Sequence, residues 1–195
     1  LHRLVTILSI INIQKIMNET YHCSDVVVKP KLYSSYGAGV RLLSSFKDEE
    51  DLKKYFQRFG PLLAQPLLES IYSEGEFSLV FLGETCIHAV NKVSGNLLIN
   101  EDFNPKYNMI TPPNELLEKS KIIRSYIQEK YGCSTEGIFR FDFIKHNETF
   151  LLSEFEMGNP GIYIKDTKIY PEFFSKLDMY LEHLKTKQIV LLSKH

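Results

Sequence analysis

The sequence predicts an α+β fold in which antiparallel hairpins alternate with amphipathic helices. Short runs rich in β-branched and aromatic residues occur in pairs around turn residues, as at Gly83-Glu84 and His146-Asn147. Longer segments with apolar residues at helical spacing lie between these pairs. The chain has 195 residues, of which 44% are hydrophobic and 24% charged, and this is the balance of a globular protein with one large domain or two small ones.

The first half of the chain is expected to hold two helices and several strands. The helices are predicted at 13–22 and 45–59, and Ser45 is the expected N-cap of the second, which ends at Gly60-Pro61. Apolar and β-branched runs between turn signals predict the strands, which are 25–28, 39–43, 62–71, 77–82 and 85–92. The first two of these strands, and also the last two, are expected to pair as hairpins.

The second half opens with a polar segment, residues 94–113, that contains Asn, Pro and Gly and is predicted to be a long loop. A helix over 113–131 is expected next, and its inward residues are Leu116, Leu117, Ile122, Ile123 and Ile127. Residues 138–144 and 150–155 are expected to pair as a hairpin, and 170–185 is expected to be a closing amphipathic helix. The loop at 94–113 is a candidate boundary between two lobes.

Charge and cysteine content exclude several classes of function. The net charge is -1 and the sequence pI is about 6.7, so there is no electrostatic basis for binding nucleic acid or an anionic membrane. Cys23, Cys86 and Cys133 are widely spaced and form no metal-binding pair. We therefore expect free thiols in a reducing compartment, the cytoplasm.

The N-terminal segment is apolar but matches no targeting signal. Residues 1–16 lack a small-residue cleavage site, and they are too short and too often interrupted by polar residues to span a membrane. The chain begins with Leu rather than Met. Residues 1–24 are therefore interpreted as a remnant of an upstream domain, which packs against that domain or against the core.

Carboxylates gather near the end of the chain. Arg140 and Asp142 share one face of a strand, and Glu154 and Glu156 share one face of the next. If these strands pair, three carboxylates and one guanidinium converge on a small patch. Like charges so close repel unless a cation lies between them, and hard oxygen ligands suit Mg²⁺. The residues leave two interpretations open, which are a magnesium site and a solvated sheet face with Arg–carboxylate ion pairs.

Two weaker patterns lie in the first half. Lys29 ends the valine-rich strand before a Ser/Gly loop, whose backbone N–H groups could cradle phosphate oxygens, although no GxxxxGK[ST] motif occurs. The run Gln65–Leu68 could pack against an adenine, and Glu76 could bind ribose hydroxyls. Taken alone, these patterns also fit an exposed lysine beside a hairpin turn, a core strand and a turn glutamate.

In this order the pieces resemble the ATP-grasp superfamily, in particular the glutathione-synthetase-like ATP-binding proteins that include the cyclo-ligase of cycloserine biosynthesis. The resemblance extends from about Asp25 to Ile162. It rests on VVVKP with its glycine loop, LAQPLLESI, GEFSLVF, HAVNK, FRFDF and LLSEFEMGNP. It implies two α+β lobes with antiparallel sheets that hold ATP between them, the first over 25–92 and the second, with the metal site, over 93–195.

The resemblance also implies a role for each matching residue. The implied nucleotide-binding residues are Lys29, Ser34, Ser35, Gly37, Gln65, Leu67, Leu68 and Glu76. The implied catalytic residues, which would face the nucleotide or the acyl-phosphate and the transferred phosphoryl group, are Lys92 and Arg140. The implied ligands of Mg²⁺, with Mn²⁺ as an alternative, are Asp142, Glu154 and Glu156.

The implied activity is an ATP- and Mg²⁺-dependent, ADP-forming ligation of a small-molecule carboxylate to an amine or related nucleophile through an acyl-phosphate, compatible with a homo-oligomer. The sequence departs from the family at three points, and the last two of them favour an alternative, a degenerate ATP-grasp module that binds nucleotide without ligase activity. Glu156 stands where many members have Asn, the segment 95–100 lacks the arginine that usually follows the HAVNK piece, and the N-terminal substrate domain is largely missing.

Overall fold

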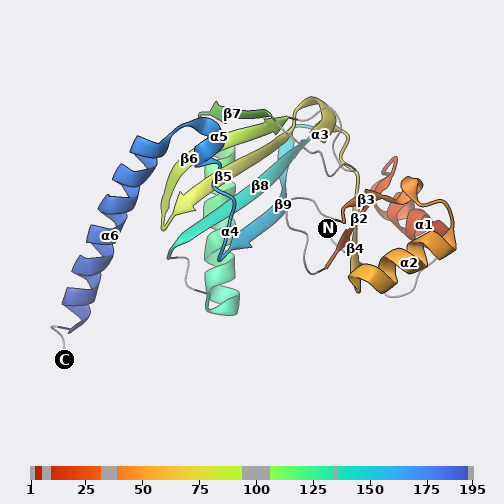
Figure 1. The fold of residues 1–195 in the computed structure, drawn as a ribbon, viewed down its shortest axis with the longest axis horizontal. Coiled ribbons are helices and arrows are strands. Elements are labelled where there is room, and N and C mark those ends of the chain that lie inside the picture. Colours follow the sequence, from red (N-terminus) through yellow and green to blue (C-terminus); the bar gives the residue numbers. More distant parts are fainter. Residues whose placement is uncertain (1–2, 6–9, 32–38, 94–105, 134–135, 193–195) are drawn as a thin grey trace. The chain divides into compact units, whose positions relative to one another are not determined.

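The chain divides into two compact units, each built around its own antiparallel sheet (Figure 1). The computed structural model describes residues 3–5, 10–31, 39–93, 106–133 and 136–192. Among the described residues, unit 1 comprises those up to Tyr72, and unit 2 comprises Ser73–Val93 and those from Lys106 onward. The predicted α+β class with two antiparallel sheets is confirmed. Ser73–Val93, which the predicted division placed in the first lobe, lies in unit 2 because its strands pair with later strands.

Unit 1 is a four-stranded sheet in the order β1-β4-β2-β3. Its strands are β1 (Arg3–Val5), β2 (Val26–Pro30), β3 (Arg41–Leu42) and β4 (Leu62–Pro66), and its helices are α1 (Ile10–Tyr21) and α2 (Glu49–Phe59). Ile13 and Met17 of α1 are buried in a core with Val26 and Val28 of β2. Helix α1 therefore packs onto the sheet of its own unit, because this burial removes apolar surface from water.

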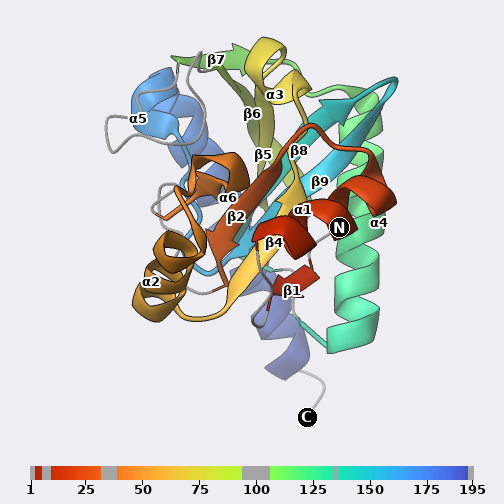
Figure 2. The same cartoon turned by 90° about the vertical axis from the view of Figure 1, so that its right-hand side faces the viewer.

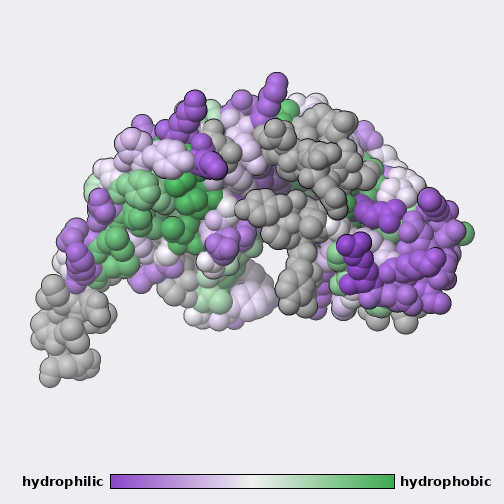
Figure 3. Space-filling view, viewed as in Figure 1, coloured by the Kyte–Doolittle hydropathy of each residue, from purple (hydrophilic) through white to green (hydrophobic). Residues whose placement is uncertain are grey.

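Two local expectations for unit 1 are wrong. The N-cap of α2 is Asp48, whose Oδ1 accepts a hydrogen bond of 2.8 Å from the backbone of Asp51, whereas Ser45 closes a 3-10 turn and donates to the Leu42 carbonyl. The expected strand 62–71 ends at Pro66, and its last residues belong to α3 (Ser70–Ser73). The surface over α2 is mainly hydrophilic, in keeping with its sequence EEDLKKYFQRF (Figure 3).

Unit 2 is a five-stranded sheet in the order β7-β6-β5-β8-β9. Its strands are β5 (Glu76–Leu82), β6 (Thr85–Val93), β7 (Lys106–Ile110), β8 (Ile138–His146) and β9 (Thr149–Met157), and its helices are α4 (Asn114–Tyr131), α5 (Ile164–Thr167) and α6 (Tyr170–Leu192). Both expected hairpins, β5–β6 and β8–β9, are confirmed.

The expected loop 94–113 contains a strand that the sequence analysis missed. Residues 106–110 form β7, which pairs with β6 from Val93↔Lys106 to Ala89↔Ile110, while residues 94–105 lie outside the described part of the chain. Lys and Asn are uncommon in strands, so the pairing with β6 rather than local propensity decides this element.

The two faces of the unit 2 sheet differ in character because side chains alternate along each strand. On one face Phe139, Phe141 and Phe143 pack with Leu116 of α4, and the views show this helix behind the sheet and alongside β9 (Figures 1 and 2). Ile122 was expected to face this core but is 67% exposed, because it lies on the outer side of α4. The opposite face carries charged residues from four strands, namely Glu76, Lys92, Arg140, Asp142, Glu154 and Glu156.

In the part of the chain that the structure describes, no helix has the length and apolar character needed to cross a membrane. The expectation of a cytoplasmic protein is not tested further by this finding.

Candidate functional site

The strand register assembles a cluster of charged side chains on the face of the unit 2 sheet opposite α4, which we call the charged face. Glu76 of β5 lies opposite Lys92 of β6. On the neighbouring pair of strands, Arg140 lies opposite Glu156 and Asp142 lies opposite Glu154. The structure therefore brings these six residues together, as the sequence predicted for the last four.

Asp142 is the centre of the charged face. Its side chain is 1% exposed, and both carboxylate oxygens bind Arg140, with distances of 2.9 and 3.0 Å to Nε and 2.8 Å from Oδ2 to Nη2. Ser78 donates its hydroxyl to Oδ1 at 2.5 Å, and the ammonium of Lys92 lies 3.7 Å from Oδ2. The negative charge of Asp142 is thus enclosed by two cations and a hydroxyl group.

Arg140 joins the three carboxylates that were predicted to bind metal. Besides its contacts to Asp142, its Nη2 lies 2.8 Å from Oε2 of Glu156 and 3.4 Å from Oε2 of Glu154. Its Nη1 donates to the carbonyl of Gly161 at 3.0 Å. The planar fork of arginine suits such multiple contacts, because it presents donors in a fixed geometry.

Lys92 connects the two halves of the charged face. Its ammonium lies 2.5 Å from Oε2 of Glu76 and donates to the phenol of Tyr163 at 3.3 Å. Gly75, immediately before Glu76, has a φ of +77°, and a Cβ at this position would lie only 2.4 Å from the carbonyl oxygen of Lys92. The close approach of β5 to β6 at this point therefore requires glycine.

Neighbouring opposite charges shift the pKa values of Lys92 and Asp142. Burial opposes the charged form of Lys92, but the carboxylates of Glu76 and Asp142 outweigh it and raise the lysine pKa. Burial likewise disfavours ionised Asp142, but Lys92 and Arg140 outweigh it and hold its pKa below the usual range. Asp142 therefore stays ionised in the folded protein.

This pKa shift predicts a specific acid sensitivity. Because the pKa of Asp142 is lower in the folded than in the unfolded state, its contribution to stability is present above the unfolded pKa of about 3.9 and is lost as the pH falls through the folded pKa. Urea unfolding of the wild-type chain and of Asp142→Asn at a series of pH values measures it. The stability difference between them should shrink on acidification below about pH 4, whereas a constant difference contradicts the assignment.

The net negative charge of the charged face favours the binding of a divalent cation. Glu76, Asp142, Glu154 and Glu156 carry four negative charges and Lys92 and Arg140 two positive ones, which gives a net charge of -2. The described residues contain no ready-made group of three or more metal-ligating side chains. The side chains of Glu154 and Glu156, however, are 46% and 33% exposed. Two accessible carboxylates fit Mg²⁺, which commonly takes one or two from the protein and the rest of its ligands from phosphates and water.

The predicted nucleotide-binding residues of the first lobe lie in unit 1. Lys29 is on β2 and Gln65 on β4, with Leu67 and Leu68 directly after that strand, whereas Ser34, Ser35 and Gly37 lie outside the described residues. In the described part of the chain no group pairs with the buried Oε1 of Gln65. An unsatisfied buried acceptor is costly, and a donor such as an adenine amino group would satisfy it.

Solved structures match this arrangement, although neither a protein-family model nor a curated protein matches the chain by sequence. D-cycloserine synthetase DcsG matches with a TM-score of 0.69 over 84% of this chain, at 17% identity. D-alanine–D-alanine ligase from Bacillus anthracis matches with a TM-score of 0.59 over 96% of the chain, also at 17% identity. The chain has an ATP-grasp fold. An ATP-grasp domain protein of the RimK type from Sphaerobacter thermophilus matches as well, with a TM-score of 0.50, 14% identity and coverage of 80% of this chain and 50% of that one.

The chain covers only part of the length of these proteins. The chain spans 58% of D-cycloserine synthetase and 62% of the Bacillus anthracis ligase. The resemblance inferred from the sequence is thus confirmed for the fold, and the role of each site residue stays a prediction.

Sequence reasoning missed two residues that contact the charged face, Ser78 and Tyr163. Ser78 reaches Asp142 because β5 pairs with β8 across a separation of 64 residues, which no local pattern reveals. Tyr163 reaches Lys92 because the backbone after β9 returns over the sheet, where His88 Nε2 donates to the Ile162 carbonyl at 2.7 Å. The sequence signal for Ser78 was its polar side chain within the otherwise apolar run 77–82.

Proposed function

We propose that this chain is the nucleotide- and magnesium-binding part of an ATP-dependent, ADP-forming ligase that joins a small-molecule carboxylate to an amine or related nucleophile through an acyl-phosphate. The observation that carries the proposal is the charged face itself, with two cations, four carboxylates and a net charge of -2. Its setting in an ATP-grasp fold supports the choice of ATP as the ligand. We assign such chemistry to the cytoplasm, where ATP is available and thiols stay reduced.

Magnesium is proposed to bind at Glu154 and Glu156 and at Asp142, which is buried beside them in the same sheet. These two glutamates offer the exposed oxygen ligands of the charged face, and Asp142 is enclosed by cations. When bound, Mg²⁺ would neutralise phosphate charge and act as a Lewis acid. Mn²⁺, with the same preference for oxygen ligands, is the proposed substitute.

The chain's own residues are proposed to bind and orient the nucleotide. Lys92 and Arg140 would stabilise negative charge on the transferred phosphoryl group, because preformed cations in a site of low dielectric constant act on developing charge without reorganisation. Asp142 holds both cations in place. Lys29 with Ser34, Ser35 and Gly37 is proposed to bind phosphates.

The remaining nucleotide contacts are proposed for the adenosine moiety. Gln65 and the backbone at Leu67 and Leu68 would bind adenine, which the unsatisfied Oε1 of Gln65 supports. Glu76 would bind the ribose hydroxyls. A substrate carboxylate would then attack the γ-phosphate, and an amine would displace phosphate from the resulting acyl-phosphate.

Replacing both exposed carboxylates is expected to abolish magnesium-dependent nucleotide binding. In the double variant Glu154→Gln/Glu156→Gln, the side chains keep their size but lose the anionic oxygens that a hard cation prefers. Isothermal titration calorimetry with ATP in excess MgCl₂ should show an affinity at least tenfold weaker than that of the wild-type chain, a loss of about 1.4 kcal/mol.

The matched control for this experiment is Glu84→Gln, which removes a carboxylate that is 90% exposed at the β5–β6 turn and pairs only with Arg124 among the ion pairs of the described residues. Its affinity for Mg-ATP should equal that of the wild-type chain. Equal affinities in the wild-type chain and the double variant would contradict the metal assignment.

A degenerate module that binds nucleotide without turnover is the second candidate function. One observation favours it, because Arg140 forms ion pairs with all three carboxylates, and these pairs compete with the metal coordination that turnover would require. ADP release in the presence of mixed amino acids separates the two functions. Release above the rate without acceptor supports the ligase, whereas tight Mg-ATP binding with no release under any acceptor supports the degenerate module.

A further inference from the structure

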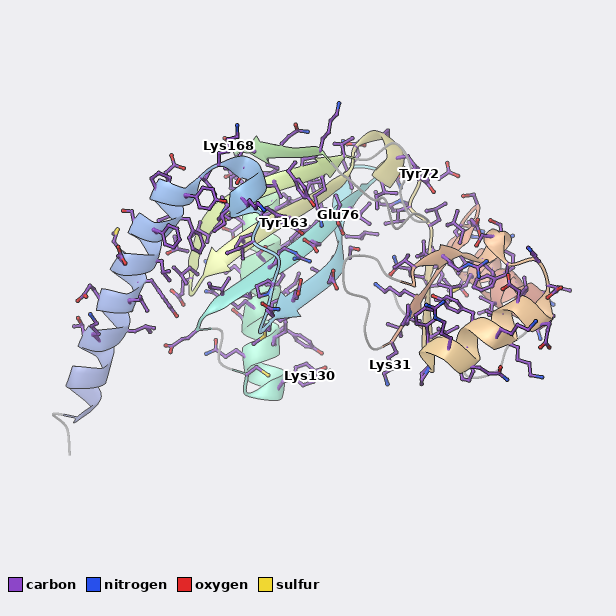
Figure 4. All side chains as sticks on the ribbon, in the orientation of Figure 1. Lys31, Tyr72, Glu76, Lys130, Tyr163 and Lys168 are labelled. Atoms are coloured by element: carbon purple, nitrogen blue, oxygen red, sulfur yellow. The ribbon has the colours of Figure 1, made fainter. Side chains whose placement is uncertain are left out.

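We propose that Tyr163 is a specificity-determining residue of the charged face, where its ring covers the two cations and denies them to small free anions. The inference rests on the proposed function, because it concerns how phosphate groups reach Lys92 and Arg140. The labelled side chains of Tyr163 and Glu76 mark this region of the unit 2 sheet in Figure 4.

The ring of Tyr163 contacts both cations at once. Its centroid lies 5.4 Å from Nζ of Lys92 and 5.4 Å from Cζ of Arg140, and its hydroxyl accepts the hydrogen bond from Lys92. Cations are attracted to the face of an aromatic ring, more strongly where water is excluded. The side chains of Lys92 and Arg140 are only 11% and 8% exposed. A single aromatic side chain thus contributes to the cover over both.

The backbone around Tyr163 is fixed to the same sheet. The carbonyl of Gly161 accepts from Arg140 at 3.0 Å and the next carbonyl, that of Ile162, accepts from His88 at 2.7 Å. Tyr107 of β7 stacks on the ring of Tyr163 with a centroid distance of 5.1 Å. A Cβ at Gly161 would lie 3.1 Å from Nη1 of Arg140, so glycine allows the close approach. Tyr163 is therefore positioned by contacts on both sides.

As a consequence, solvent reaches the negative charges of the charged face more easily than its positive charges. Glu154 and Glu156 are 46% and 33% exposed, while the cations lie beneath the ring. A free anion meets the negative side chains first and is repelled. It also lacks other contacts that would offset the displacement of Tyr163. A ligand that binds elsewhere on the protein and brings a metal with its phosphates can displace the ring, so the site distinguishes a metal–nucleotide complex from inorganic phosphates.

Metal-free tripolyphosphate tests this inference without nucleotide or turnover. In EDTA, the wild-type chain should bind tripolyphosphate weakly in calorimetric titration, and Tyr163→Leu should bind it at least tenfold more tightly because the cations become accessible. Tyr163→Phe keeps the ring and should bind as weakly as the wild-type chain. A residue that only supported the fold would lower stability on replacement and would not raise the affinity for an anion.

The control variant is Tyr126→Leu, which removes a half-exposed tyrosine from α4. Its affinity for tripolyphosphate should be unchanged. If Tyr163→Leu does not fold, Tyr163→Met fills a similar volume with a flexible side chain and should show the same gain. Folded variants without the ring that bind tripolyphosphate no better than the wild-type chain overturn the inference. If the wild-type chain fails to bind Mg-ATP, the proposed function is overturned. The tripolyphosphate affinities of the variants can still be compared, because that experiment uses neither metal nor nucleotide.

Discussion

Replacing Asp142 with asparagine is expected to lower the free energy of unfolding by about 3–5 kcal/mol, the cost typical of removing one partner from a buried ion pair. Asp142 is buried, and its charge compensates Arg140 at 2.8 Å and Lys92 at 3.7 Å. Asparagine keeps the shape but leaves two largely buried cations with less neutralisation. Urea unfolding monitored by circular dichroism measures the loss.

The control for Asp142→Asn is Glu154→Gln, which removes a half-exposed carboxylate at 3.4 Å from the same arginine. Because exposed ion pairs contribute little, its cost should stay below about 1 kcal/mol. Equal and small losses in both variants would show that Asp142 does not carry the charge balance of the buried cluster.

Replacing Gly75 with alanine is expected to destabilise the fold by about 2–5 kcal/mol. The left-handed backbone, with a φ of +77°, costs an alanine about 1–2 kcal/mol. The new Cβ would lie 2.4 Å from the carbonyl oxygen of Lys92, and relieving such a contact typically costs about 1–3 kcal/mol. The shift acts directly at the Glu76–Lys92 pair, so thermal unfolding and Mg-ATP affinity should both fall.

Gly132→Ala provides the matched control for Gly75→Ala. Gly132 also has a positive φ, of +62°, but a Cβ there would meet nothing within 4 Å. Its cost should therefore be limited to the backbone term of about 1–2 kcal/mol. If the two alanine variants lose the same stability, the close approach of β5 to β6 at Gly75 adds nothing to the cost of the substitution.

Sequence reasoning succeeded where structure is decided locally. The turns at Gly83-Glu84 and at Asn147-Glu148, one residue beyond the expected His146-Asn147, join adjacent strands. Their hairpins and the shared face of Arg140 and Asp142 therefore follow from local turn signals and alternation. Sequence reasoning failed where the pairing of strands that are distant in the sequence decides the structure. The strand β7 forms only because β6 offers an edge, and β5 belongs to unit 2 because it pairs with β8.

The same distinction applies to the candidate site. The alternation of β8 and β9 predicted three converging carboxylates, and the structure confirms that they share one face. The alternation did not predict that Asp142 is enclosed by Lys92 and Arg140. The enclosure depends on the pairing of distant strands and on the segment at Tyr163 that returns over the sheet. For Asp142 the structure therefore adds a charge-balancing role to the predicted metal-binding one.

Paramagnetic broadening by Mn²⁺ in the presence of ATP tests the central claim, that the charged face holds a divalent cation with a nucleotide. In a two-dimensional amide spectrum of the ¹⁵N-labelled chain, substoichiometric Mn²⁺ with ATP should broaden the signals of Asp142, Glu154 and Glu156 first. Signals at the end of α4, around Lys130, should stay sharp, and excess Mg²⁺ should restore the broadened ones. Broadening elsewhere, or none on β8 and β9, would contradict the claim.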